Sequence, residues 1–160
     1  MTIGVGDKIP SATMYKMTGE GPAAVSTDEL FGGKTVAIFG VPGAFTPTCS
    51  AKHLPGFVEK ASEIKAKGVD TIACVSVNDV FVMDAWGKAN HAGDDVLMVA
   101  DGNCEFTRAM GLVLDRSGFG MGDRSRRYAL VAQDGVVEKL FLEEGNEYRV
   151  SSAEYVLANI

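Results

Sequence analysis

The chain has 160 residues, 46% of them hydrophobic, and a formal net charge of −6 at pH 7. This length and apolar content suit one globular domain over residues 1–160 with a full-sized core, and they exclude a disordered chain. The negative charge argues against nucleic acid or an anionic membrane surface as a partner, and no apolar run approaches the roughly 20 residues of a membrane span.

The three cysteines, at positions 49, 74 and 104, are odd in number and widely spaced. This arrangement is not a disulfide framework, and it indicates a reducing compartment. The N-terminal residues have neither the basic start and apolar stretch of a signal peptide nor the arginine-rich character of a transit peptide. We therefore expect a cytoplasmic protein.

Strands alternate with helices in the first part of the chain. Apolar runs, caps and turn residues predict strands at 12–16 and 22–26, a short helix with a capping box at Ser26–Glu29, a strand at 34–40, a helix over 48–67, a strand at 70–77 and a helix from Asn78 or Asp79 to Asn90. On this last helix we expect one face, formed by Val82, Ala85, Trp86 and Ala89, to be buried.

The remaining chain predicts a strand, a hairpin and a closing helix. We expect a strand at 96–100, a short helix over 104–110 opened by Asp101 or Asn103, a glycine- and charge-rich loop over 114–126, a hairpin of strands 128–132 and 136–142, and a helix from a capping box at Ser151–Glu154 to Ile160. This order predicts a three-layer α/β/α fold with a mixed central sheet and an N-terminal β-hairpin. It is the order of a thioredoxin-like fold, a similarity that concerns architecture and not chemistry.

The loop from Val41 to Ser50 contains a single cysteine, Cys49, in the first turn of the helix predicted over 48–67. First-turn N–H groups have no intrahelical acceptor, and the helix dipole favours negative charge there. With a nearby cation, such a position can lower a cysteine pKa from about 8.5 to roughly 3.5–7.5. Most cysteines are small core residues. The prolines, glycines and hydroxyls around Cys49 instead favour a rigid pocket built from backbone.

Three stretches of the sequence are informative about chemistry, and not only about the order of helices and strands. They are Pro42-Gly43-Ala44-Phe45-Thr46-Pro47-Thr48-Cys49 with Lys52-His53-Leu54-Pro55-Gly56-Phe57 after it, Val75-Ser76-Val77-Asn78-Asp79 with Phe81-Val82-Met83 and Trp86, and Arg124-Ser125-Arg126-Arg127-Tyr128. The first contains the Pro-x-x-x-Thr-x-x-Cys core of the peroxiredoxin active-site loop. Together they resemble the peroxiredoxin-5 or type II branch over nearly the whole chain.

The resemblance implies a thiol peroxidase that reduces hydrogen peroxide and small alkyl hydroperoxides without a metal or organic cofactor. Cys49 would be the nucleophile and would become a sulfenic acid. Thr46 would place its hydroxyl beside the sulfur, Pro42 would wall the pocket against water, and backbone N–H groups around Thr48 would act as donors. Arg127 would hold the thiolate and bind the peroxide oxygens.

Each assignment has a plainer alternative. Without the resemblance, Thr46 fits a turn residue, and Arg124, Arg126 and Arg127 fit a solvated basic turn. Only Arg127 matches the family's catalytic arginine. It directly precedes a strand, so alternation places it on the face opposite Tyr128. We therefore assign Arg127 to the site and leave the other two arginines on the surface.

The remaining cysteines bear on how the sulfenic acid is resolved. His53 lies one helical turn after Cys49, but a zinc site needs about four ligands and no second pair is present, so we interpret His53 as structural. We expect Cys74 to be buried and inert, and Cys104 to be at the surface or semi-buried, with a pKa that a helix start could lower. The stretch 143–152, where members with an internal disulfide carry the resolving cysteine, contains none.

We therefore expect reduction by an external thiol, either glutathione with glutaredoxin or thioredoxin. The resemblance also implies a homodimer, to which four aromatic residues would contribute: Phe45, Phe81, Trp86 and Phe119. The alternative for Phe81 and Trp86, which lie on an amphipathic helix, is packing on the sheet. Two other functions stay open, a thioredoxin-like disulfide oxidoreductase and a redox-sensing or chaperone protein. The first is disfavoured because Thr46 stands where a Cys-x-x-Cys motif has its first cysteine.

Overall fold

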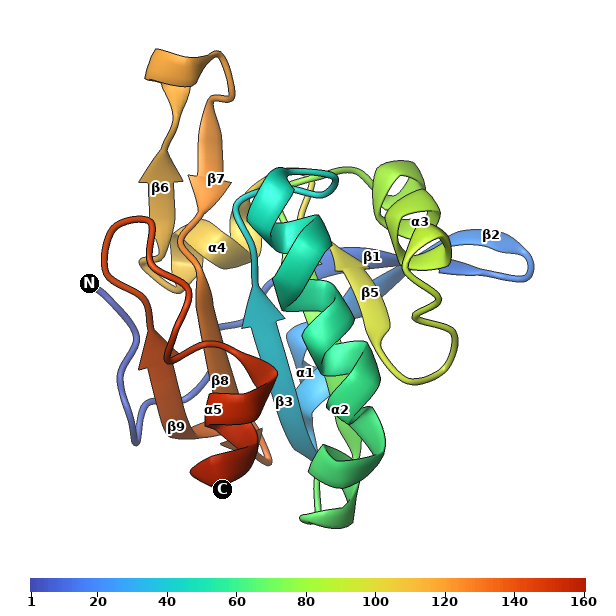
Figure 1. The fold of residues 1–160 in the computed structure, drawn as a ribbon, viewed down its shortest axis with the longest axis vertical. Helices are drawn as coiled ribbons and strands as arrows, with labels where there is room; N and C mark the ends of the chain where they lie inside the picture. The colour runs from blue at the N-terminus through green and yellow to red at the C-terminus, as the bar shows by residue number, and fades with distance from the viewer.

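The computed structural model describes residues 1–160, and a seven-stranded mixed sheet lies at its centre (Figure 1). The strand order is β2-β1-β5-β4-β3-β8-β9. The strands are β1 Thr13–Thr18, β2 Gly21–Ser26, β3 Thr35–Gly40, β4 Thr71–Ser76, β5 Leu97–Ala100, β8 Tyr128–Gln133 and β9 Val136–Leu142.

The parallel strands β3, β4 and β5 form the middle of this sheet. The hairpin β1–β2 extends it beyond β5 through one antiparallel pair, Tyr15 with Ala100. On the other side β8 and β9 pair antiparallel, joined by the turn at Asp134 and Gly135, which both have positive φ as a tight hairpin requires. The predicted mixed sheet with an N-terminal hairpin is confirmed.

Helices cover both faces of the sheet. They are α1 Thr27–Phe31, a π-helical turn at Cys49–His53 that runs into α2 Leu54–Ala66, α3 Val80–Ala89, α4 Glu105–Ala109 and α5 Ala153–Ala158. Figure 1 shows α2 and α5 in front of β3 and β8, with α1 and α4 behind. Successive side chains of a strand point to opposite faces, so Phe39 packs in the core with α2 while Ile38 packs in the core with α1. The result is the expected three-layer arrangement. None of these helices is long and apolar enough to cross a lipid bilayer.

The segment predicted as a loop over 114–126 is instead a short hairpin. Its strands β6 Val113–Asp115 and β7 Asp123–Ser125 pair antiparallel, with a 3-10 turn at Ser117–Phe119 between them. The hairpin projects from the body of the protein beside the loop that follows β3 (Figure 1). Strands of three residues with several glycines nearby have no apolar alternation, which is why the prediction was wrong.

The buried face of α3 differs from the expected one. Met83, Trp86 and Gly87 are buried, while Ala85 and Ala89 are exposed. The spacing is still that of one helical stripe, rotated from the predicted one. Trp86 has no exposed surface and donates from Nε1 to Ser50 Oγ at 2.9 Å. It is therefore a core residue and not a contributor to a dimer interface.

The predicted capping box at the last helix is one residue out of register. Ser152 is the N-cap of α5, and its hydroxyl accepts from Tyr155 N at 3.2 Å. Ser151 Oγ instead donates to the buried carboxylate of Glu143 at 2.6 Å. The box at Ser26 and Glu29 is present as predicted.

Candidate active site

The loop after β3 is held in one shape by a hydrogen bond to a neighbouring segment and by one within the loop. Ala44 N donates to Asn78 Oδ1 at 3.0 Å, and Thr46 Oγ1 donates to the Gly43 carbonyl at 2.6 Å. Phe45 has a φ of 63°, which is rare for a bulky residue and persists only where the surroundings impose it. Just before the loop, Gly40 lies so close to the Tyr128 ring that a side chain could not be accommodated. The sequence thus builds a rigid turn that delivers the chain to Cys49.

Cys49 opens the π-helical turn and is fully buried. The N–H groups of Thr48 and Cys49 donate to no backbone or side-chain acceptor in the protein, as expected for the first turn of a helix. The next residue, Ser50, is tied to Trp86 by the hydrogen bond described above. The sulfur therefore sits at a helix start, shielded from water and close to unpaired donors.

Arg127 brings a positive charge to this sulfur. Its Nη2 donates to Cys49 Sγ at 3.2 Å, and its Nη1 donates to His53 Nδ1 at 2.9 Å. The guanidinium also lies 6.0 Å from the centre of the Tyr148 ring. Tyr128, the next residue along the chain, is buried on the other face, as the predicted alternation requires. Of the predicted site residues, Arg127 and Cys49 are in direct contact.

His53 fixes the other side of the arginine. Because a guanidinium has only donors, Nδ1 of His53 must accept, and Nε2 then donates to the Ser151 carbonyl at 2.9 Å. Burial, followed by the charge of Arg127, lowers the pKa of His53 to about 3, so the ring is neutral at pH 7. His53 is therefore a structural residue as predicted, but it also positions the cation of the site.

Glu143 anchors the segment that accepts the hydrogen bond from His53. Its Oε2 accepts from the backbone N–H of Arg149 at 2.6 Å and of Ser151 at 2.9 Å, as well as from the Ser151 hydroxyl. Sequence reasoning missed this role of Glu143, because its burial is visible only in the structure. The partners of these residues are distant in sequence, so no local pattern connects them.

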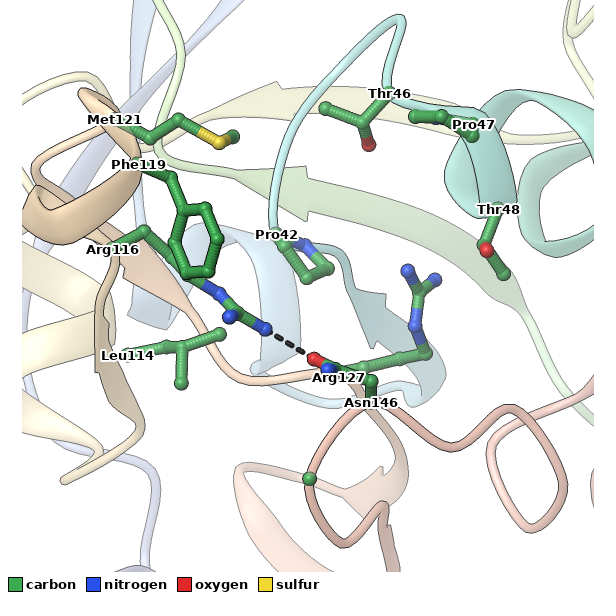
Figure 2. A pocket seen from close by; sticks show the side chains of 11 residues that line it. Pro42, Thr46, Pro47, Thr48, Leu114, Arg116, Phe119, Met121, Arg127 and Asn146 are labelled. Carbon is green, nitrogen blue, oxygen red and sulfur yellow. Dashed lines mark hydrogen bonds between the residues drawn. The ribbon is translucent and has the colours of Figure 1, made fainter.

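A pocket of about 550 Å³ lies at the active-site loop, with Arg127 as one of its lining residues (Figure 2). It is lined by Pro42, Thr46, Pro47, Thr48, Leu114, Arg116, Phe119, Met121, Arg127, Gly145 and Asn146. The structure thus gathers Pro42, Thr46 and Arg127 at one pocket, and Arg127 links that pocket to Cys49. Sequence reasoning missed the wall supplied by the β6–β7 hairpin.

The neighbouring arginines do not reach the sulfur. Arg124 is half-buried and donates from Nε to the Met121 carbonyl at 2.9 Å. Arg126 is also half-buried and lies 3.4 Å from the Glu143 carbonyl. Both side chains were predicted to be at the surface and are instead half-buried. Neither contacts Cys49, as predicted.

The other two cysteines are free and buried. Cys74 pairs in register with Phe39 in the middle of the sheet, and burial raises its pKa well above the ordinary value. Cys104 has 4% of its surface exposed, and burial with the nearby Asp101 raises its pKa. Cys104 is more deeply buried than the expected surface or semi-buried position, and its pKa is raised and not lowered, because α4 is short and its first-turn N–H groups bind the Asp101 carboxylate. No group of three or more metal-binding side chains is placed to hold a metal ion.

Comparison with known proteins identifies the family. The Redoxin family model matches residues 4–157. The chain is 58% identical to Peroxiredoxin-2E-2, chloroplastic, of Oryza sativa subsp. japonica, covering 98% of this chain and 72% of that protein. It is 51% identical to Peroxiredoxin-2B of Arabidopsis thaliana, covering 97% and 96% of the two chains. The crystal structure of reduced Prx3 from Vibrio vulnificus in complex with H2O2 superposes with a TM-score of 0.95 at 51% identity, covering 99% of each chain. The chain therefore belongs to the peroxiredoxins, redoxin-family enzymes that reduce a peroxide with electrons from a thiol.

Proposed function

We propose that Cys49 is the sulfur that attacks the peroxide. The observation that carries this assignment is the 3.2 Å contact from Arg127 Nη2 to Sγ of Cys49, a residue with no exposed surface. A guanidinium at this distance stabilises the anionic sulfur, since charge-assisted hydrogen bonds are strongest away from water. The thiolate forms a bond to the terminal peroxide oxygen, the O–O bond breaks, and the other oxygen leaves with the electron pair and takes a proton. The product is a sulfenic acid.

The pocket residues take complementary roles in this step. The hydrogen of the Thr46 hydroxyl is used by the Gly43 carbonyl, so its oxygen is free to accept the O–H of a hydroperoxide. Arg127 and the unpaired N–H groups of Thr48 and Cys49 are available to the oxygen that leaves with negative charge. Pro42 closes the wall of the pocket without offering a competing donor.

A stopped-flow experiment with hydrogen peroxide tests the assignment. The reduced protein should be oxidised stoichiometrically and far faster than a free thiol, and Cys49→Ser should abolish the reaction. Cys74→Ser is the matched control, because Cys74 is equally buried but lies in a strand, and the guanidinium of Arg127 donates to Cys49 and not to Cys74. Loss of the fast phase in the control, or its survival in Cys49→Ser, would contradict the proposal.

The sulfenic acid is proposed to be reduced by an external thiol, either glutathione with glutaredoxin or thioredoxin. The burial of Cys74 and Cys104 and the absence of cysteine in 143–152 support this route. NADPH-coupled turnover with each reducing system separates the two donors. An intramolecular disulfide found by mass spectrometry after one equivalent of peroxide would show instead that the chain resolves its own sulfenic acid.

A homodimer in the cytoplasm remains our proposal for the state of the protein. Phe45, Phe81 and Phe119 are exposed large apolar side chains, and aromatics of this kind favour interface cores. Light scattering on the reduced protein, with Phe81→Ser as a variant, tests the pairing, since a monomeric native protein would contradict it.

The three free cysteines fit a reducing compartment, and fractionation of the source cell tests the location.

A further inference from the structure

The active-site pocket contains a second guanidinium, that of Arg116, which the peroxidase reaction does not use. Arg116 comes from the turn of the β6–β7 hairpin and lies 5.4 Å from the centre of the Phe119 ring. Its Nη2 donates to Asn146 Oδ1 from the opposite side of the pocket (Figure 2). These two contacts orient the side chain across the opening instead of into solvent.

The charge of Arg116 is not neutralised by any neighbour. It takes part in no ion pair, and no Asp or Glu lines the pocket, in a chain with 21 acidic and 15 basic residues. The adjacent Asp115 uses its carboxylate to accept from Ser117 N at 2.8 Å. Glu147, on the facing loop, lies 3.9 Å from Arg149. The pocket of an acidic protein is thus lined by two cations, Arg116 and Arg127, and no anion.

Several of the other lining residues are apolar, beside Thr46, Thr48 and Asn146, and the pocket is larger than hydrogen peroxide alone requires. Leu114, Phe119 and Met121 form the wall on the hairpin, and Pro42 and Pro47 lie on the active-site loop. The volume of about 550 Å³ is in the range of sites for organic ligands and many times the roughly 30 Å³ that a small molecule such as water occupies. An apolar wall between two guanidinium groups fits a molecule with an apolar body and an anionic end.

We propose that this pocket binds organic hydroperoxides that carry a carboxylate, with Arg116 holding the carboxylate and Arg127 the hydroperoxide. The inference rests on the proposed role of Cys49. The reaction is R–O–O–H with the Cys49 thiolate and one proton, which gives the sulfenic acid and R–O–H. Arg116 keeps four N–H donors after its contact with Asn146, enough for a bidentate carboxylate.

A matched pair of substrates tests the proposal. The probes are cumene hydroperoxide with a carboxylate at the para position and the methyl ester of the same compound, each compared with hydrogen peroxide in single-turnover stopped flow. The native protein should react at least about tenfold faster with the acid than with the ester, because a charge-assisted hydrogen bond contributes about 1.5–3 kcal/mol, which corresponds to about 10–150-fold. The preference should shrink in 0.5 M salt, since part of the interaction is exposed to solvent.

Three variants assign the effect to one side chain. Arg116→Gln should bring the acid-to-ester ratio close to one, and Arg116→Lys should retain part of the preference because the charge remains. Arg108→Gln is the matched control, an exposed arginine that pairs with Asp123 outside the pocket, and it should keep the native ratio. A native ratio near one, or a preference that survives in Arg116→Gln, would overturn this inference alone. Failure of the native protein to react with hydrogen peroxide would overturn the proposed function and this inference with it.

Discussion

Removing the titratable ring of His53 should remove part of the acid sensitivity of the fold. Burial, and then the charge of Arg127, lowers the pKa of His53 from its usual 6.5 to about 3. Between these values the unfolded chain binds a proton that the folded protein does not, so stability falls as the pH drops through this window. At pH 5, which is 1.5 units below the usual pKa, the loss is about 2 kcal/mol at 1.36 kcal/mol per unit.

The assay is urea unfolding at pH 7, 6 and 5. Ordinary carboxylates have pKa values near 4, so their titration contributes little to the change in stability over this range. His53→Gln is the test variant, because an amide keeps one donor and one acceptor but does not titrate. Whatever its free energy of unfolding at pH 7, that value should fall by about 2 kcal/mol less than the native value between pH 7 and pH 5. His91→Asn, which changes the other, exposed histidine, is the control. An equal fall in His53→Gln and native protein would refute the reasoning.

Three further changes probe the loop, the sheet and the spare thiol. Thr46→Val should slow the reaction with hydrogen peroxide about 2–10-fold in stopped flow, because one acceptor and the bond to Gly43 are lost, whereas Thr46→Ser should stay near the native rate. Gly40→Ala should lower the free energy of unfolding by about 1–3 kcal/mol, since the new methyl group would overlap the buried Tyr128 ring; an unchanged urea midpoint would contradict this. Native Cys104 should resist iodoacetamide at pH 8, because it is buried and its pKa is raised, and it should be labelled only after unfolding, as peptide mass spectrometry can show.

The order of strands and helices could be predicted because each element carries a local signal. The apolar run before Gly40 marks β3, and the Asp134–Gly135 turn marks the last hairpin. The β6–β7 hairpin could not be found in this way. Of its six strand residues only Ser125 is buried, so no apolar periodicity reveals it, and the wall that it gives to the pocket was missed with it.

Four residues of the candidate site could be predicted from the sequence, three from a motif and one from the family resemblance. Pro42, Thr46 and Cys49 stand in one continuous motif, and Arg127 was identified by resemblance. The contact of Arg127 with His53 joins residues 74 positions apart, and that of His53 with Ser151 joins residues 98 apart. Such contacts follow from the packing of α2 against the segment before α5 and have no signature in local sequence. For the same reason, the sequence could not show whether Ser151 or Ser152 is the N-cap of α5.

The central claim is that the contact of Arg127 with the buried Cys49 sulfur makes the thiol reactive. The most direct test is the second-order rate constant for oxidation by hydrogen peroxide in single-turnover stopped flow, measured for native protein and Arg127→Gln. A charge-assisted hydrogen bond of about 1.5–3 kcal/mol predicts a rate about 10–150-fold lower in the variant. Circular dichroism and the urea midpoint verify that the variant is folded. A folded Arg127→Gln protein that reacts at the native rate would contradict the account.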